Sequence, residues 1–225
     1  MQTGGDITMC GRFALTVDIE KIAKTFGVAP TIEITRRYNI APTQNVVSIV
    51  RNGTTHLTEL RWGLIPSWAK DESIGARMIN ARAETLVEKP SFKGLLRSKR
   101  CLIITDGFYE WRQENGHKTP MYISMKDSEP FAFAGLWDNW KSPDGQQLRT
   151  CTIITTGPNE VIAPIHNRMP AILLPEARDA WLDTTIKDES LLTHLLAPYP
   201  SEAMTARAVS RLVNDPKHDG PELLA

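Results

Sequence analysis

The sequence predicts an α+β fold with a mixed or antiparallel, barrel-like β-sheet and flanking helices. Three observations support this class: several short strand-like runs separated by turn compositions, a hairpin signal early in the chain, and helical patterns near both ends. No internal repeat, low-complexity segment or long linker divides the 225 residues, and 41% of them are hydrophobic, which suits one large core. We therefore expect a single domain.

The first element expected is an amphipathic helix. Apolar residues recur at helical spacing from Ile19 to Phe26. Thr16 precedes them as a candidate N-cap, and Gly27 follows where a C-terminal cap would stand.

A β-rich region follows this helix. Asn52-Gly53 is the strongest short hairpin signal, so it predicts two antiparallel strands within residues 45–62. Further strand-like runs read CLIITDGFYEW, PMYISMK, FAFAGLWDNW and RTCTIITT, and the turn compositions ENGHKT, KDSE and SPDG separate them. Together these runs predict a meander or a closed, barrel-like sheet.

Two helices are expected towards the end of the chain. PEARDAWLDT is opened by Pro175, a residue tolerated in a first helical turn, and ESLLTHLLA follows it.

The composition excludes several functional classes. Lysine plus arginine total 26 and aspartate plus glutamate total 26, so no general field attracts nucleic acid or membrane, and any polyanion site must be a local patch. No apolar run approaches a membrane span, and the first residues lack the features of a signal peptide. We expect a cytoplasmic, nucleoid-associated monomer.

The cysteines and histidines argue against a metal site. Cys10, Cys101 and Cys151 are odd in number and form no CxxC pair, and the five histidines have no ligand spacing with one another or with cysteines. We expect no metal and no cofactor. Cys101 and Cys151 lie in apolar runs and are expected in the core.

Four segments combine reactive or polar residues with turn-forming or aromatic neighbours: MCGRF, RRYNIAPTQ, MINARAET, and DGFYEW together with PIHNRMP. Taken singly, Cys10 is more often a small buried hydrophobe, and His166 is more often a structural histidine. Glu110 lies between two aromatic residues, where a buried carboxylate needs a partner or takes a raised pKa; the alternative is an outward-facing residue.

Other polar and aromatic positions also have two interpretations. Asn80 and Arg82 are two apart and would share one face of a strand, or be a buried amide and a surface cation. Trp62 is expected in the core. Trp68 follows the turn-like IPS and precedes charged residues, so we expect it at the surface.

In their order along the chain, these segments resemble the SRAP (SOS response-associated peptidase) family of abasic-site processing proteins, which crosslink to damaged single-stranded DNA. The resemblance extends from Met9 over nearly the whole chain, through RWGLIPSWAK, TTGPNEVIAPIHNRMP and the closing AVSRLVNDPKHDGPEL. It implies that Cys10 is the nucleophile. The other residues to which it assigns roles are the supporting Asn80, Glu110 and His166, the phosphate-binding Arg12 and Arg82, and Asn39, Pro42 and Trp68 along the DNA-binding cleft.

A cysteine at a free amino terminus can react with an aldehyde in two steps. Its amine forms a Schiff base, and its thiol then closes a five-membered thiazolidine. The α-amine titrates near ~7.7–8.0, so part of it is nucleophilic at neutral pH. Glu110 could transfer the protons if partial burial raises its pKa, with His166 as a second acid or base and Asn80 as an orienting donor.

This chemistry requires that the nine residues before Cys10 be absent. We expect residues 1–9 to be missing or removed from the active form, which leaves residues 10–225 as a single SRAP domain. Met9 could be the true start, because Gly4-Gly5-Asp6 can be encoded by a purine-rich run typical of a ribosome-binding site. Alternatively, Cys10 could cleave the preceding peptide bond itself, assisted by Glu110 or His166.

Three activities therefore stay open. The first is covalent capture of abasic sites in single-stranded DNA, with possible strand cleavage by β-elimination. The second is a cysteine peptidase that uses Cys10 and His166. The third is a noncovalent reader of modified DNA in which Cys10 is structural.

Overall fold

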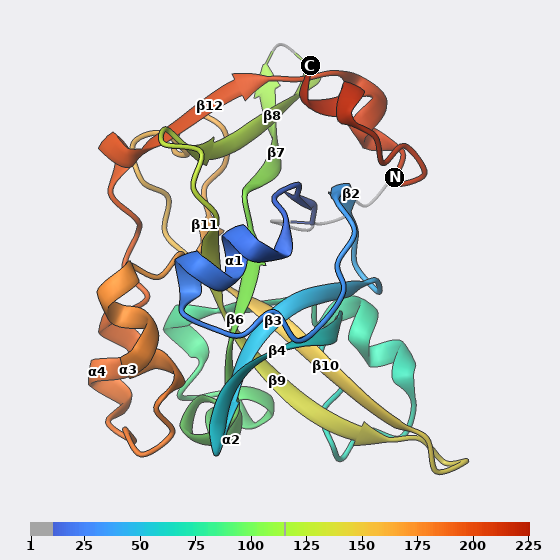
Figure 1. Cartoon of the computed structure of the whole chain (residues 1–225), viewed down its shortest axis with the longest axis vertical. Helices are drawn as coiled ribbons and strands as arrows, with labels where there is room; N and C mark the ends of the chain where they lie inside the picture. The colour runs from blue at the N-terminus through green and yellow to red at the C-terminus, as the bar shows by residue number, and fades with distance from the viewer. Residues whose placement is uncertain (1–10, 115) are drawn as a thin grey trace.

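A closed barrel of five strands forms the centre of the molecule in the computed structural model, which describes residues 11–114 and 116–225 (Figure 1). The strands are joined in the order β10-β4-β3-β6-β9, and β9 pairs again with β10. β4 and β10 run parallel, and the other four pairings are antiparallel, which confirms the expected mixed, barrel-like sheet. The barrel strands are β3 (Asn45–Asn52), β4 (Thr54–Trp62), β6 (Arg100–Thr105), β9 (Phe131–Lys141) and β10 (Gln147–Thr156).

A second, antiparallel sheet lies beside the barrel in the order β12-β8-β7-β1-β2. β12 and β8 are at the top of Figure 1. Two short strands, β5 and β11, add to β10 outside the barrel. The bounds are β1 (Phe13–Leu15), β2 (Arg37–Ile40), β5 (Asn80–Arg82), β7 (Gly107–Glu114), β8 (His117–Met125), β11 (Met169–Pro170) and β12 (Met204–Ala208).

The chain passes from one sheet to the other at Asp106 and Gly107. The sequence pattern indicates one strand-like run here, but β6 belongs to the barrel and β7 to the second sheet. The Asp106 carboxylate fixes the corner by accepting hydrogen bonds from both the backbone N–H and the hydroxyl of Thr16, each at 2.6 Å. Gly107 allows a close approach, since a Cβ there would lie 2.1 Å from the Tyr122 ring.

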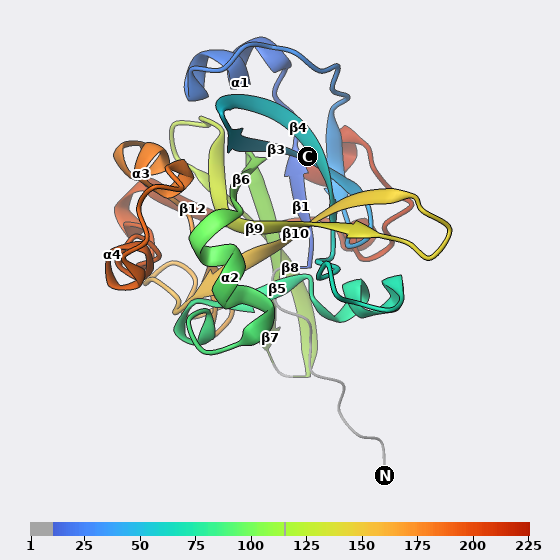
Figure 2. The ribbon, with the colours of Figure 1, turned by 90° about the horizontal axis from the view of Figure 1, so that it is seen from below.

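The helices surround the barrel. α1 (Ile19–Phe26) confirms the first expected helix, although its N-cap is Asp18, because Thr16 is bound to Asp106. Gly27 closes it at φ +64°, as expected for a left-handed cap. α3 (Arg178–Leu182) and α4 (Glu189–His194) confirm the two later helices and lie together at one side in the view from below (Figure 2).

α2 (Pro90–Ser98) was not expected from the sequence. It packs on β6 and β9 through Phe92 and Leu96. Pro90 in its first turn is the signal that the sequence offers, and no side chain caps it. No helix in the described parts of the chain is long and apolar enough to cross a membrane. The 3-10 helices are η1 (Glu72–Arg77), η2 (Ala83–Thr85), η3 (Pro175–Ala177), η4 (Ser201–Ala203), η5 (Arg211–Asn214) and η6 (Pro221–Leu224).

Aromatic contacts join the two sheets in one core. The Phe13 ring of β1 lies 5.2 Å from the Trp62 ring and 5.7 Å from the Phe133 ring of the barrel. Cys101 and Cys151 are fully buried free thiols, which confirms that they are core residues.

Arg100 ties two helices to the barrel from a fully buried position. Its guanidinium donates hydrogen bonds to the backbone carbonyls of Leu96, Trp181 and Asp183. These carbonyls lie at the C-terminal ends of α2 and α3, where a cation is favourable to the helix dipole.

Candidate functional site

The strand that follows Cys10 is held against β7. Cys10 itself lies outside the described residues. Phe13 is opposite Phe108 in the β1–β7 pairing, and the Tyr109 N–H donates to the Arg12 carbonyl at 2.9 Å. This pairing extends to Arg12 and brings the beginning of β1 towards Glu110, the next residue along β7.

Glu110 is buried, with 3% of its surface exposed. The alternative of an outward-facing residue on a half-exposed strand is therefore wrong. Tyr109 and Trp111 lie on the opposite face of β7, because successive residues of a strand alternate, and they pack together in a small cluster with Tyr122.

Asn80 begins β5, which runs parallel to β10 with Asn80 opposite Ile153. Trp62 connects this strand to the N-terminal one. Its indole N–H donates to the Ile79 carbonyl at 2.9 Å, while its ring contacts Phe13. Trp62 is fully buried, as expected, but its position between β1 and the start of β5 was not anticipated from the sequence.

A cavity of about 530 Å³ opens beside Asn80 and Arg82. Both residues line it, as expected for positions two apart on a strand. Arg77 and Lys89 also line it, so the cavity carries a local positive charge on a chain with zero net charge. Such a patch suits an anionic backbone. Arg77 and Lys89 were not selected from the sequence, because isolated surface cations have no distinctive pattern.

His166 lies in the loop between β10 and β11. Its Nδ1 is 3.1 Å from the backbone nitrogen of Arg168 and 3.3 Å from the carbonyl oxygen of the same residue. Burial lowers the pKa of His166 below its ordinary value, which favours the neutral ring. The two contacts at Nδ1 correspond to the two tautomers of the neutral ring: an Nδ1 that accepts the Arg168 N–H leaves the hydrogen on Nε2, and an Nδ1 that donates to the Arg168 carbonyl leaves Nε2 as an acceptor.

An ion pair connects the His166 loop to the segment after β5. Arg168 donates to both carboxylate oxygens of Glu84, at 2.5 and 2.8 Å, and to the Thr155 carbonyl at 2.7 Å. The bidentate pair lowers the pKa of Glu84. Arg82 is opposite Thr155 in the β5–β10 pairing, so the structure brings the His166 loop and Arg82 to the same end of β10. Arg168 and Glu84 lie within the HNRMP and NARAET motifs but were not selected.

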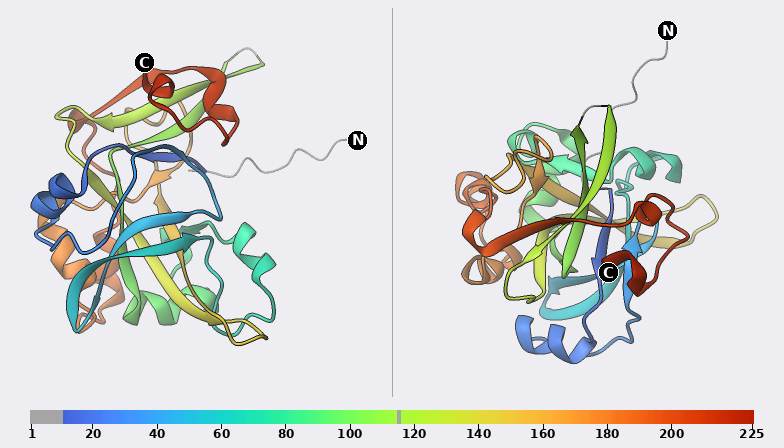
Figure 3. Two further views of the ribbon diagram at one scale, coloured as in Figure 1. Left: turned by 45° about the vertical axis from the view of Figure 1, so that its right-hand side comes forward. Right: turned by 90° about the horizontal axis from the view of Figure 1, so that it is seen from above.

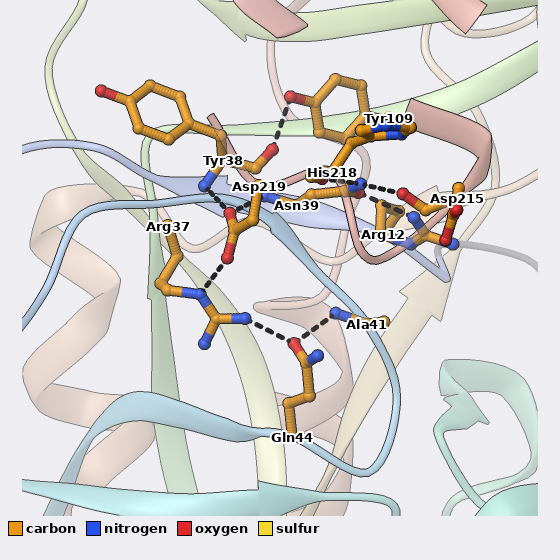
Figure 4. A network of polar contacts seen from close by, with 10 residues as sticks. All are labelled: Arg12, Arg37, Tyr38, Asn39, Ala41, Gln44, Tyr109, Asp215, His218 and Asp219. Atoms are coloured by element: carbon orange, nitrogen blue, oxygen red, sulfur yellow. Dashed lines mark hydrogen bonds and ion pairs between the residues drawn. The ribbon is translucent and has the colours of Figure 1, made fainter. Parts of the chain in front are cut away.

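Arg12 and Asn39 lie together on the other side of β1. Arg12 is half-buried and donates through Nη1 to Asn39 Oδ1 at 2.7 Å (Figure 4). Burial lowers the pKa of Arg12, but the guanidinium stays charged. Asn39 is fully buried and has no surface to offer to DNA in this arrangement, so the structure does not place its side chain along a cleft as the resemblance implies.

Pro42 and Trp68 lie on adjoining loops. The turn after Pro42 contains Thr43 at φ +73°, a left-handed conformation that is costly for a β-branched residue. The Thr43 N–H donates to the Trp62 carbonyl at 2.8 Å, and Thr43 shares a cavity of about 250 Å³ with Ile65 of the Trp68 loop.

Trp68 is 63% exposed, in agreement with the expected surface position. Two hydrogen bonds to β9 hold its loop. The Ser67 N–H donates to Asp138, and the Trp140 indole donates to the Ala69 carbonyl, each at 2.8 Å. A large apolar side chain that is exposed to solvent on a loop fixed by hydrogen bonds on both sides is typical of a binding surface.

The fold defines a class of protein that is already represented among solved structures. A crystal structure of a protein from Bacteroides thetaiotaomicron is similar with a TM-score of 0.85 and 29% sequence identity, covering 96% of this chain and 98% of that one.

The sequence places the chain within a family of this class. The family model for SOS response associated peptidase (SRAP) matches residues 9–216. A relative from Bacillus subtilis, the abasic site processing protein YoqW, is 51% identical over 221 residues, which cover 96% of this chain and 99% of the relative. The Gallus gallus abasic site processing protein HMCES is 37% identical over 75% of this chain and 56% of its own length. The chain belongs to the SRAP family.

Proposed function

We propose that this protein processes abasic sites in DNA by forming a covalent crosslink through Cys10. The observation that carries the proposal is the agreement between the family and the site. A relative named an abasic site processing protein is 51% identical in an alignment that covers 96% of this chain. In the structure, the strand after Cys10 pairs with the strand that carries the buried Glu110, and Trp62 connects it to β5, which lines a cationic cavity.

The reaction begins at the ring-opened aldehyde of an abasic deoxyribose. The Cys10 amine adds to the carbonyl carbon, and loss of one water gives a Schiff base. The thiol then adds to the imine carbon, and its proton moves to the nitrogen, which gives the thiazolidine. The adduct weighs the sum of protein and DNA minus one water.

Glu110 and His166 supply the proton transfers of these steps. Glu110 takes and returns the protons of the amine and of the leaving water. His166 acts as the second acid or base on the sugar oxygen during ring opening. Asn80 orients the terminal cysteine or the sugar.

The substrate of this proposal is single-stranded DNA, because the exposed Trp68 ring suits stacking on an unpaired base. Arg12 and Arg82 bind phosphates, and Pro42 and Trp68 present apolar surfaces to bases. A Schiff base at the abasic site also permits β-elimination, so strand cleavage is a side reaction of the same intermediate.

The amine of Cys10 becomes available only when residues 1–9 are absent. The match to the family model begins at Met9, which supports a functional chain that starts there and loses its methionine. Self-cleavage of the peptide bond before Cys10 is the second route. The description of the family as a peptidase supports this route.

The test compares protein that begins at Cys10 with the full chain carrying an uncleavable leader. Each is incubated with a single-stranded oligonucleotide containing one abasic site, and the products are resolved by denaturing gel and intact mass. We expect an adduct at the summed mass minus water from the first protein only. Absence of an adduct from both proteins would refute the crosslinking function and favour a noncovalent reader or a peptidase.

Two properties make this experiment specific. Cys101 and Cys151 are fully buried, and burial raises the pKa of both thiols, so alkylation of the folded protein reports on Cys10 alone. A Cys10→Ser variant keeps the amine but lacks the thiol. It should give a Schiff base that borohydride traps, without the stable thiazolidine.

A further inference from the structure

The last part of the chain closes over β2, the strand that carries Asn39. Residues 213–219, which we name the C-terminal clasp, lie beside β2 and β7 (Figure 3, Figure 4). The Asn39 side-chain nitrogen lies 3.3, 3.1 and 2.6 Å from the carbonyl oxygens of Val213, Asp215 and His218, and its two hydrogens serve all three because one of them is shared. One buried side chain therefore holds three points of the clasp.

Asp219 holds the clasp from the other end. Its Oδ1 accepts hydrogen bonds from the backbone N–H groups of Tyr38 and Asn39, at 2.5 and 2.8 Å. Its Oδ2 forms an ion pair with Arg37. A carboxylate that accepts three donors is strongly oriented.

The network continues from Asp219 to the Pro42 turn. Arg37 donates through Nη2 to the side-chain oxygen of Gln44 at 2.8 Å, and the same oxygen accepts the Ala41 N–H at 3.1 Å (Figure 4). Ala41 directly precedes Pro42, so the ion pair supports the backbone on which Pro42 lies.

The network also ends at Arg12. Besides its bond to Asn39, Arg12 Nη1 donates to the Val213 carbonyl at 2.7 Å. Arg12 Nε is buried and has no hydrogen-bond partner among the described residues. The clasp therefore fixes one nitrogen of the guanidinium and leaves Nε unpaired.

We propose that Asn39 and Asp219 are positioning residues that orient Arg12 and the Pro42 turn for DNA through the C-terminal clasp. This inference rests on the proposed function, in which Arg12 and Pro42 contact the DNA strand. Both ends of the hydrogen-bonded network reach these two contacts, and the bonds that the clasp makes with Arg12 and β2 join residues 174 to 201 positions apart in sequence. A side chain already held in its binding orientation loses less freedom when the ligand arrives.

The test separates binding from chemistry. Affinity is measured on the full chain with a single-stranded oligonucleotide that contains tetrahydrofuran, an abasic analogue without an aldehyde. The maximal rate of adduct formation is measured with the form that begins at Cys10 at saturating abasic DNA. Asp219→Asn keeps an oxygen for the two N–H groups but places an amide against Arg37, so it weakens the network selectively.

We expect Asp219→Asn to weaken affinity for the analogue on the order of tenfold, equivalent to about 1.4 kcal/mol, with the maximal rate changed less than about twofold. Arg12→Ala should weaken it similarly, and the double variant should lose less than the product of the two losses. Lys217→Ala, an exposed change within the clasp, is the matched control and should bind like the wild type.

Arg37→Gln provides a second route if Asp219→Asn lowers the folded fraction. This ion pair is partly exposed, with 31% and 24% of the two side chains accessible, so the variant should remain folded. The positioning role would be overturned if Asp219→Asn and Arg37→Gln both bound the analogue with wild-type affinity. It would also be overturned if the loss of affinity in the double variant with Arg12→Ala equalled the product of the two single losses. A wild-type protein that binds the analogue but forms no adduct would instead refute the crosslinking function. The affinities of the variants would still show whether the clasp positions Arg12.

Discussion

Replacing Trp62 by phenylalanine should affect the candidate site more than an equivalent change elsewhere in the core. The indole N–H of Trp62 donates to the Ile79 carbonyl at 2.9 Å, and its ring contacts Phe13 at 5.2 Å. The hydrogen bond is worth about 1 kcal/mol, because Ile79 keeps a second donor in Ile153. The lost ring atoms and the space that they leave cost about 2 kcal/mol more. We expect the free energy of unfolding to fall by about 3 kcal/mol.

Trp181 offers a matched control. It is equally buried, and its indole donates to the Cys101 carbonyl at 3.0 Å, far from the site in the fold. Trp181→Phe should therefore cost similar stability. Urea unfolding gives the free energies, and adduct formation with abasic single-stranded DNA gives the rates, at a temperature where both variants are folded.

The rates should separate the two variants. Trp62 joins β1 to the residue before Asn80, so Trp62→Phe should slow adduct formation on the order of tenfold, which is less than the ~100-fold that a displacement of about 1 Å at a reacting group can cost. Trp181→Phe should stay within about twofold of the wild type. Equal rates in the two variants would refute the reasoning that Trp62 aligns the N-terminal strand with Asn80.

Four further predictions follow from features of the fold and the site. Gly107→Ala should destabilise the protein by about 3 kcal/mol or more, measured by urea unfolding, because the new Cβ would lie 2.1 Å from the Tyr122 ring. Arg100→Met should cost about 3 kcal/mol in the same assay, since several buried carbonyls lose their donor; a cost under about 1 kcal/mol would contradict this role. Burial lowers the pKa of His166, so the unfolded chain takes up a proton at higher pH than the folded chain. The folded state should lose stability as the pH falls below ~6.5, and His166→Gln should flatten this part of the stability curve. Trp68→Ala should leave the melting temperature within a few degrees but weaken binding of single-stranded DNA by about 1–3 kcal/mol in a fluorescence titration, and unchanged affinity would exclude base stacking.

Local patterns predicted the elements that depend on local chemistry. The first helix, the hairpin at Asn52-Gly53 and the two late helices lie where periodicity and turn residues place them. The barrel-like sheet also followed, because short strands separated by turns must pair with one another to satisfy their backbone groups.

Contacts between distant segments could not be predicted in this way. CLIITDGFYEW has the same apolar character on both sides of Asp106, so the pattern does not show that the chain changes sheets there. Thr16 resembles an N-cap, but a carboxylate 90 positions away takes its hydroxyl. Both errors arise because a tertiary hydrogen bond outweighs a local preference.

The candidate site likewise contains residues that local motifs predicted and residues that only the fold revealed. The motifs selected Asn80, Glu110 and His166, and the structure adds the residues that hold their segments, Trp62 and Arg168. The sequence cannot show whether an asparagine faces solvent or carbonyls, so the burial of Asn39 by the C-terminal clasp required the fold. The roles of the motif residues in catalysis stay predictions.

The parallel pairing of β4 with β10 affects how the protein is made. It places Arg61 opposite Thr150, so the barrel cannot close until about two thirds of the chain has been synthesised. The clasp that fixes Arg12 forms later still, because residues 213–219 follow all the barrel strands along the chain. A nascent chain therefore exposes its first strand for many seconds before the groups that orient it exist. The orientation of Arg12 is therefore acquired only after residues 213–219 have been synthesised.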